Sequence, residues 1–413
     1  MKQVKPFDIS KREVWEAFKK VKANQGAAGV DGQSIAEFEA DLANNLYKLW
    51  NRLSSGSYMP PPVRRVDIPK ADGGTRSLGI PTVADRVAQE VVRRYLEPVV
   101  EPIFHPDSYG YRPGRSAIDA VRTARERCWR SAWVVDLDIK GFFDTIDHEL
   151  LLKAVRRHAT NRWAVLYIER WLKAPVQLED GTIQQRATGT PQGGIVSPVL
   201  SNLFLHYVFD MWMSRTLPHV QFERYADDII CHVRTRGEAI AVLRKLHVRF
   251  IACKLTLHPD KTKIVYCRDT NRPGDYPIIS FDFLGFTFRP RLAKWPNGKF
   301  GVSFLPAASR AALKEIRKTV RLWGLQRRSD QHLHDLAHKF GPVIRGWINY
   351  YSHFYKSALY PSLRLIDDHL VRWAQRKFKL LRQRPKQARA WVRRAIRITP
   401  GLFAHWRLLY ANC

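Results

Sequence analysis

The stretch Tyr225-Ala226-Asp227-Asp228 sets two adjacent carboxylates between two short extended segments. Residues 221–225 precede the acidic pair and the apolar run 229–233 follows it, so we predict two strands joined by a tight turn. A carboxylate buried in that turn needs a basic or metal partner, because removing an ionised group from water is costly. An isolated Asp-Asp pair is most often just a turn, so its meaning depends on the rest of the chain.

A third carboxylate, Asp138, stands near the end of the apolar run 132–139, which we predict to be a buried strand. Mg²⁺ prefers oxygen ligands, often one or two carboxylates together with substrate phosphates. Two such ions about 3.5–4 Å apart activate the attacking oxygen and stabilise the leaving oxygen in phosphoryl transfer. Asp138, Asp227 and Asp228 are therefore candidate catalytic metal ligands, and the alternative is a strand cap beside a plain turn.

The composition indicates a polyanionic partner. The 413 residues include 69 Lys+Arg and 38 Asp+Glu, a formal net charge of +31, and nucleic acid is the polyanion that such proteins most often bind. Residues 306–413 hold 23 Lys+Arg against 5 Asp+Glu, which is more than half of the excess. No run approaches the roughly 18 apolar residues of a membrane span, so we expect no membrane partner.

The chain has the composition of a folded intracellular protein. Hydrophobic residues make up 45% of it, which is enough for a sizeable core and excludes a disordered protein. The five cysteines are scattered and never spaced as C-x-x-C, so we expect neither a disulfide framework nor a zinc site. The N-terminus has no signal-peptide core.

Periodicity and turn residues predict further elements around the acidic motifs. Residues 63–69 and 75–80 alternate like the arms of a hairpin, with Lys70 and Arg76 as basic residues beside the turn. A glycine-rich loop over 188–194 opens a helix. We predict helices over 11–23, 34–53, 83–100, 148–173, 197–209 and 237–252.

Taken in chain order, the motifs resemble those of reverse transcriptases, and specifically of the proteins that bacterial group II introns encode. The resemblance covers nearly the whole chain. The matching blocks are residues 29–32, 68–70 with 76–81, and 109–116 for the fingers, 138–144, 225–228, 257–263 and 283–286 for the palm, 189–194 with 197–198 for the template and nucleotide loop, and 344–351 and 402–406 for the thumb. Gln192-Gly193-Gly194 favours the group II type over retron and diversity-generating enzymes.

The resemblance implies an α+β right-hand polymerase with fingers, an antiparallel-sheet palm and an α-helical thumb. We expect the N-terminal extension and fingers over 1–125, the palm with part of the fingers over 126–305, and the helical thumb or maturase domain over 306–413. The implied activity is RNA-directed DNA synthesis with two Mg²⁺ ions, for which Mn²⁺ could substitute. The implied ligands are Asp138, Asp227, Asp228 and the backbone carbonyl of Ile139.

By the same resemblance, residues from several motifs bind the incoming nucleotide. Lys70 and Arg76 would hold the triphosphate, unless the hairpin contacts the template instead. Phe143 would exclude a ribose 2′-hydroxyl, or be a core residue. Gln192 and Gly193 would border the sugar and base, or form a simple turn.

Four further residues have two alternative roles each. Lys261 would assist protonation of pyrophosphate or be a surface lysine. Tyr225 would pack under the primer end or be an ordinary strand aromatic, and Arg112 and Arg115 would contact template phosphates or brace the fingers. In the thumb, we expect the tryptophans to be core residues and the Lys and Arg around them to contact RNA and duplex backbones.

The implied partners are a structured intron RNA, an RNA template, a DNA primer or target and dNTPs, in the bacterial cytosol and at the nucleoid. The oligomeric state stays open. We expect reverse transcription, help in intron splicing, and retromobility by target-primed reverse transcription. The chain stops at Cys413 without a paired C-x-x-C, so we expect no HNH endonuclease and a primer from host replication or nicking.

Two alternative functions remain. One is a splicing-only RNA-binding maturase, against which the intact aspartate triad argues. The other is a free-standing group II-like enzyme recruited to host defence or DNA repair, which the protein sequence hardly distinguishes.

Overall fold

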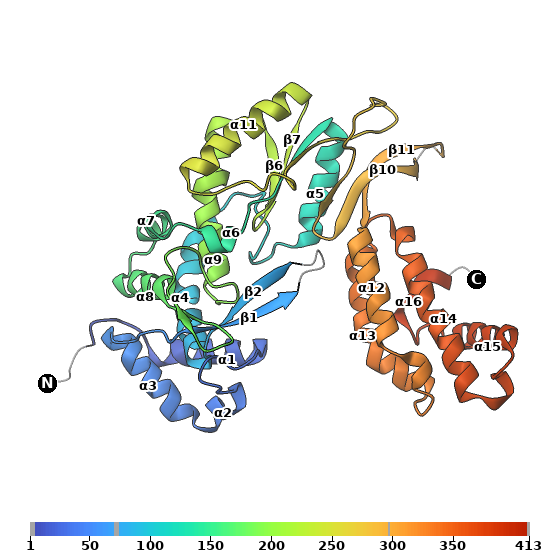
Figure 1. Ribbon diagram of the computed structural model, residues 1–413, viewed down its shortest axis with the longest axis horizontal. Helices are drawn as coiled ribbons and strands as arrows, with labels where there is room; N and C mark the ends of the chain where they lie inside the picture. Colours follow the sequence, from blue (N-terminus) through green and yellow to red (C-terminus); the bar gives the residue numbers. More distant parts are fainter. Residues whose placement is uncertain (1–4, 70–73, 296–297, 411–413) are drawn as a thin grey trace. The chain divides into compact units, whose positions relative to one another are not determined.

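The computed structural model describes residues 5–69, 74–295 and 298–410 (Figure 1). The chain divides into two compact units. Unit 1 comprises residues 1–120 and 135–264, and unit 2 comprises residues 121–134 and 265–413.

The N-terminal helices of unit 1 begin where the sequence offers capping residues. Reciprocal capping boxes start α1 (Lys11–Asn24) and α2 (Ile35–Ala40). Helix α3 (Leu42–Ser55) ends at Gly56, which has a left-handed φ of +78°. The largely buried helix α4 (Val83–Val100) contacts α1 and α3 and so ties the N-terminal helices to the rest of the unit.

The predicted hairpin is present as part of a four-stranded sheet. Strands β1 (Val63–Pro69) and β2 (Thr75–Ile80) pair antiparallel, and β4 (Val176–Gln177) runs parallel to β1 and antiparallel to β5 (Ile183–Gln184). The strand order is β2-β1-β4-β5. The hairpin tip, residues 70–73, lies outside the described residues.

A second four-stranded sheet holds the acidic motifs. Its order is β6 (Gln221–Tyr225), β7 (Asp228–Val233), β3 (Trp133–Leu137) and β8 (Lys263–Tyr266). β6 and β7 pair antiparallel, with Tyr225 opposite Asp228. Helix α11 (Arg236–Ala252) follows β7 in the chain and contacts it (Figure 1).

Further helices complete this part of the chain. They are η1 (Glu101–Ile103), α5 (Ala117–Arg130), α6 (Phe142–Thr145), α7 (His148–His158), α8 (Arg162–Lys173), α9 (Ser197–Leu205), the π-helix η2 (His206–Asp210) and α10 (Met211–Thr216). One of them, α5, passes from unit 1 into unit 2 after residue 120.

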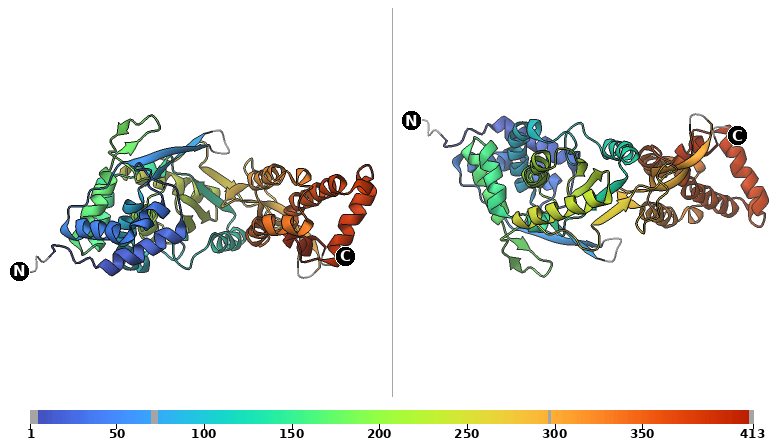
Figure 2. Two further views of the ribbon diagram at one scale, coloured as in Figure 1. Left: turned by 90° about the horizontal axis from the view of Figure 1, so that it is seen from below. Right: turned by 90° about the horizontal axis from the view of Figure 1, so that it is seen from above.

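Unit 2 joins a three-stranded sheet to a helical bundle (Figure 1, Figure 2). The sheet has the order β11 (Phe300–Ala308), β10 (Phe286–Lys294) and β9 (Phe281–Phe283), all antiparallel. The helices are α12 (Arg310–Leu322), η3 (Leu325–Arg327), α13 (Leu333–Tyr351), η4 (Lys356–Ala358), α14 (Tyr360–Lys377), η5 (Lys379–Leu381), α15 (Pro385–Ile398) and α16 (Ala404–Tyr410).

The bundle is built around one apolar core. Trp373 and Trp406 are fully buried, and Trp323, Trp347 and Trp391 pack against the same core. This placement agrees with the expectation that the thumb tryptophans are core residues. Asp367 on α14 anchors α16 by accepting hydrogen bonds from Trp406 Nε1 (2.8 Å) and the Tyr410 hydroxyl (2.8 Å).

The structure confirms the predicted α+β class, with antiparallel sheets and a helical C-terminal region. The boundary expected near Leu305 falls inside β11, so the helices begin only at Arg310. The assignment of residue ranges to fingers, palm and thumb stays a prediction. No helix in the described ranges combines the length and apolar character needed to cross a membrane.

Candidate active site

The acidic pair lies at the tight turn that the sequence predicts. Ala226 and Asp227 form the turn between β6 and β7, and Asp228 is the first residue of β7. Ala226 has a left-handed φ of +56°, as the favoured two-residue hairpin turns require at their first central position. Such a conformation costs a non-glycine residue about 1–3 kcal/mol, so the surrounding contacts must hold it.

The three aspartates interact electrostatically. Burial raises the pKa of Asp227, and the negative charge of Asp138 adds to that rise. Asp228 is exposed as a residue, but its carboxyl group is largely shielded from water. This loss of hydration, and then the negative charges of Asp227 and Asp138, raise its pKa to about 7. The structure therefore brings together two motifs that lie far apart in the sequence.

Asp138 directly follows β3, and the later palm block fixes it. The His258 amide donates to the Asp138 carbonyl (2.7 Å), and the Thr262 hydroxyl lies 3.4 Å from the Asp138 amide. Lys261 Nζ lies 3.5 Å from Asp138 Oδ2 and is half-exposed. Lys261 is thus a neighbour of the carboxylates, and its part in pyrophosphate protonation stays a prediction. Ile139 is buried and forms an isolated bridge with Leu257.

The donor set has the chemistry that a divalent cation needs. The charge of Asp138 raises the pKa of Asp227 and of Asp228, so a cation beside these carboxylates would be favoured, and carboxylate oxygens suit Mg²⁺. Over residues 5–69, 74–295 and 298–410, however, no three His, Cys, Asp or Glu side chains form a ready metal site. The three aspartates therefore suit an open metal site, in which waters and substrate phosphates supply the remaining Mg²⁺ ligands.

Two of the predicted nucleotide-binding residues contact each other. Arg76 Nε donates to Gln192 Oε1 (2.7 Å), and the Gly79 amide donates to the Gln192 carbonyl (2.7 Å). At Gly193, φ is +117° and a Cβ would lie 2.5 Å from the Gly79 carbonyl oxygen. The missing side chain thus permits close approach of β2 to the loop. Lys70 lies outside the described residues.

Phe143 is the second residue of α6, whose N-cap is the left-handed Gly141. Its side chain is 8% exposed and packs edge-on against Phe142, with ring centroids 5.3 Å apart. The Thr190 amide donates to the Phe143 carbonyl (2.7 Å). The first palm motif and the loop that presents Gln192 are therefore bonded to each other through their backbones.

Tyr111 is a site residue that the sequence reasoning missed. It has a left-handed φ of +57° and is 46% exposed. Burial of its hydroxyl raises its pKa; Arg76 opposes that rise and Asp227 adds to it, which places the hydroxyl near both. Its ring centroid lies 6.3 Å from that of Tyr225. The only signal in the sequence is its place inside the block 109–116.

The two arginines of that block differ. Arg112 has a side chain only 6% exposed; its guanidinium pairs with Glu101 (2.8 Å) and donates to the carbonyls of His105 (2.7 Å) and Ser108 (2.8 Å). This geometry fits the bracing alternative rather than template contact. Arg115 is exposed and lies over the Tyr109 ring at 5.8 Å, so its template contact stays a prediction.

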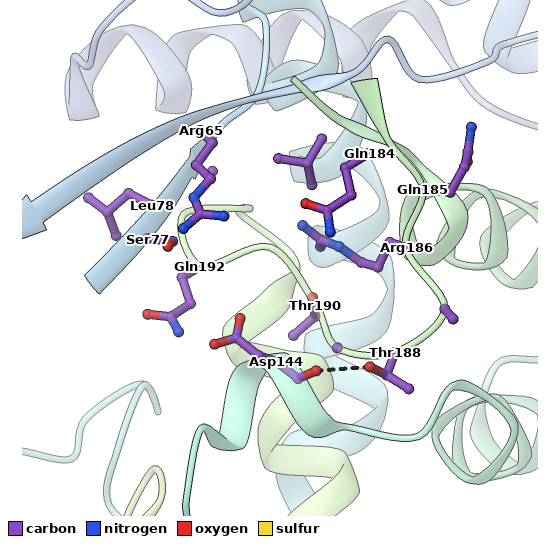
Figure 3. Close-up of a pocket in the computed structure, with 14 residues that line it drawn as sticks. Arg65, Ser77, Leu78, Asp144, Gln184, Gln185, Arg186, Thr188, Thr190 and Gln192 are labelled. Carbon is purple, nitrogen blue, oxygen red and sulfur yellow. Dashed lines mark hydrogen bonds between the residues drawn. The ribbon is translucent and has the colours of Figure 1, made fainter. Parts of the chain in front are cut away.

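A polar cavity of about 360 Å³ adjoins Gln192 (Figure 3). Arg65 from β1 and Arg186 from the segment after β5 point into it from the upper left and the right of the view, and Asp144 lies below both of them. Burial lowers the pKa of Arg186, and Asp144 partly opposes this. The cavity therefore extends the polar surface beside the candidate nucleotide site.

In unit 2, three arginines and one carboxylate, Asp282, are among the residues that line a second cavity of about 360 Å³ beside β10 and the start of α12. Arg291 donates to the carbonyls of Leu305 and Thr287, both at 3.1 Å, while Arg289 and Arg310 are exposed. Burial, followed by repulsion from Arg289, lowers the pKa of Arg291 to about 10. This concentration of positive charge is a candidate contact for phosphate groups.

Comparison with known families assigns the chain. The model of the family "Reverse transcriptase (RNA-dependent DNA polymerase)" matches residues 68–288, more than half of the chain, and includes all three aspartates. The chain belongs to the reverse transcriptase family. A second model, "Group II intron, maturase-specific domain", matches residues 313–394. The predicted resemblance to group II intron-encoded reverse transcriptases is thereby confirmed.

Curated relatives of this reverse transcriptase include YkfC of Escherichia coli (strain K12), 34% identical over 278 residues, 58% of this chain and 73% of YkfC. The group II intron-encoded protein LtrA of Lactococcus lactis subsp. cremoris is 38% identical over 193 residues, 46% of this chain and 32% of LtrA. Nuclear intron maturase 4, mitochondrial, of Arabidopsis thaliana is 31% identical over 129 residues, 31% of this chain and 16% of that protein.

The chain thus spans most of YkfC but a third or less of the other two relatives. Membership of the family makes the protein an RNA-directed DNA polymerase that depends on divalent metal. It carries a reverse transcriptase domain followed by a maturase-specific domain.

Proposed function

We propose that this protein extends a DNA primer on an RNA template with two Mg²⁺ ions, and that it also binds a group II intron RNA and assists its splicing and retromobility. The observation that supports the polymerase part best is the convergence of Asp138 with Asp227 and Asp228 beside the Arg76–Gln192 contact. Mn²⁺ could replace Mg²⁺, since both accept carboxylate oxygens.

In this proposal the three aspartates and the Ile139 carbonyl hold the metal. When bound, the metal would activate the primer 3′-hydroxyl and neutralise charge on the triphosphate. Arg76 would exchange its contact with Gln192 for phosphate oxygens, which a guanidinium binds through two parallel hydrogen bonds. Phe143 would border the sugar, and its ring would clash with a 2′-hydroxyl.

The RNA-binding part of the proposal concerns unit 2. The maturase-specific match covers residues 313–394. Helix α15, which begins inside this range and ends beyond it, has exposed arginines at positions 389, 393, 394 and 397. The second cavity adds two exposed arginines, Arg289 and Arg310. These groups would neutralise phosphates of the intron RNA and of the primer–template duplex.

Primer extension on an RNA template tests the polymerase part. Wild-type protein should incorporate dNTPs and Asp227→Ala should not, while both proteins should bind intron RNA equally and support its splicing. Wild-type protein that is as inactive as Asp227→Ala, with splicing intact, would instead establish the splicing-only alternative.

The alternative of recruitment to host defence or DNA repair needs a different observation. Reading the DNA that flanks the gene decides it, because an intron ribozyme around the gene supports retromobility. Absence of such a ribozyme would count against the splicing and mobility parts of the proposal and leave the polymerase part standing.

A further inference from the structure

We propose that Arg224, clamped by Asp210, is a positioning residue of the polymerase that fixes the peptide between Ala226 and Asp227. The inference rests on the proposed function, because it assigns to Arg224 the task of aiming the carboxylates of Asp227 and Asp228. Because its side chain is fully buried, Arg224 would act through the turn and not by binding nucleotide or metal.

The clamp is a fully buried ion pair. Arg224 Nε donates to Asp210 Oδ1 (2.7 Å) and Nη2 donates to Asp210 Oδ2 (2.6 Å), and both side chains are 0% exposed. This two-pronged geometry fixes the plane of the guanidinium. Asp210 ends the π-helix η2, and such helices are often found at functional sites.

The third nitrogen of the guanidinium reaches the catalytic turn. Arg224 Nη1 donates to the Ala226 carbonyl (3.1 Å) and to Asn202 Oδ1 (2.9 Å). The Ala226 carbonyl belongs to the peptide that carries the Asp227 amide, and Ala226 is the residue with the left-handed φ. The contact therefore holds the unfavourable conformation on which the direction of both aspartates depends.

The backbone around Arg224 is held on both edges. Its amide donates to the Asp107 carbonyl (2.9 Å), its carbonyl accepts from the Tyr109 amide (2.7 Å), and it lies opposite Ile229 on β7. Asn202 also donates to the Gly110 carbonyl (2.7 Å). With the strand fixed, the turn is the part left to adjust, and the guanidinium restrains it.

A purely structural role would be served as well by apolar side chains, because replacing both members of a buried ion pair with apolar residues often leaves stability unchanged. Apolar side chains cannot bind the Ala226 carbonyl. The double variant Asp210→Leu/Arg224→Met therefore separates stability from positioning.

We expect this double variant to unfold within a few degrees of wild type, to bind RNA normally and to keep its KM for dNTPs. Its kcat for primer extension should fall about 100-fold, the usual effect of misplacing catalytic groups by about 1 Å, and its half-saturating Mg²⁺ concentration should rise. Arg224→Lys should show the same split, since one ammonium cannot serve Asp210 and Ala226 at once.

Glu223→Gln is the matched control. Glu223 is the neighbouring buried residue on β6 and pairs with His232 at 2.5 Å, so this change perturbs the same strand away from the turn. It should leave kcat and the Mg²⁺ midpoint unchanged.

The inference is overturned if the double variant, or Arg224→Lys where the double variant does not fold, keeps the wild-type kcat and Mg²⁺ midpoint. An equal loss in Glu223→Gln also overturns it, because the loss would then come from general damage to β6. Wild-type protein without primer extension would refute the proposed function itself. Wild-type activity is therefore measured before any variant is compared with it.

Discussion

Protons and metal ions compete for the Asp228 carboxyl group. Its pKa is raised to about 7, so in the free protein it takes up a proton as the pH falls through 7, whereas a metal ligand must be deprotonated. We expect the half-saturating Mg²⁺ concentration for primer extension to rise about tenfold per pH unit below 7 and to level off above it. Mg²⁺ titrations at pH 6, 7 and 8 measure this, and a constant midpoint would count against Asp228 as a ligand.

Phe143 should determine the choice of sugar. Shortening it in Phe143→Val removes the ring that would clash with a ribose 2′-hydroxyl, so we expect discrimination against ribonucleotides to fall about 10- to 100-fold, the range for a change in one side chain that lines a pocket. The measurement is the ratio of kcat/KM for dCTP and CTP. Phe142→Leu is the control, because Phe142 is the buried neighbour and its replacement loosens the core without opening the sugar site. Unchanged discrimination in Phe143→Val would mean that Phe143 is only a core residue and does not select the sugar.

Single residues could be predicted from the sequence where one motif contains the whole signal. The aspartates lie in recognisable motifs, and Arg76 and Gln192 do as well. Arg224 gave no such signal, because its importance comes from Asp210 and Asn202, which reach it only after folding. Tyr111 was missed for the same reason, since its nearness to Arg76 is a tertiary contact.

Between elements, the contact of β2 with the loop at Gly193 leaves no room for a side chain. In Gly193→Ala a Cβ would lie 2.5 Å from the Gly79 carbonyl oxygen at a φ of +117°, so we expect a loss of about 2–4 kcal/mol in unfolding free energy. We also expect a raised KM for dNTPs, because Gln192 would move. Thermal unfolding and steady-state kinetics measure the two effects.

Gly181→Ala is the matched control for this change. Gly181 also has a left-handed φ, +86°, but nothing lies within 4 Å of its Cβ position. It should lose only about 1–2 kcal/mol, from backbone strain, with KM unchanged. Equal effects of the two substitutions would mean that the approach of β2 to the loop is unimportant.

Elements were predictable where local chemistry decides them. The hairpin arms 63–69 and 75–80 and the capped helix α1 lie where the pattern places them. The predicted helix over 148–173 is instead two helices, interrupted near Asn161, the N-cap of α8. Both helices have apolar faces, so the helical spacing of apolar residues continues across the break. The only sign of the break in the sequence is Asn161, a residue type that favours the N-cap position.

Across the whole molecule, the charge of +31 should produce a salt dependence of RNA binding. Removing the charge that neutralises one phosphate lowers the slope of log affinity against log salt by about 1. We therefore expect Arg289→Ala and Arg310→Ala each to flatten that slope by about 1, measured by filter binding at about 50 and about 200 mM salt. Asp227→Ala is the control and should leave the slope unchanged. Arginine variants with the wild-type slope would exclude this cavity from the interface.

The fold class was predictable from the sequence because a whole series of motifs supported it. The long β10–β11 pairing, with nine residue pairs, was not predicted, because its strands lack a regular alternation of polar and apolar residues. The thumb boundary was consequently drawn inside β11.

The backbone bond between Gly79 and Gln192, with Gly193 fitted against the same glycine, also bears on how such enzymes can be recombined. In a chimaera that takes the β1–β2 hairpin from one parent and the loop over 188–194 from another, the hairpin and the loop would not fit each other. The two segments lie far apart in the gene, yet they should be inherited and exchanged as one block.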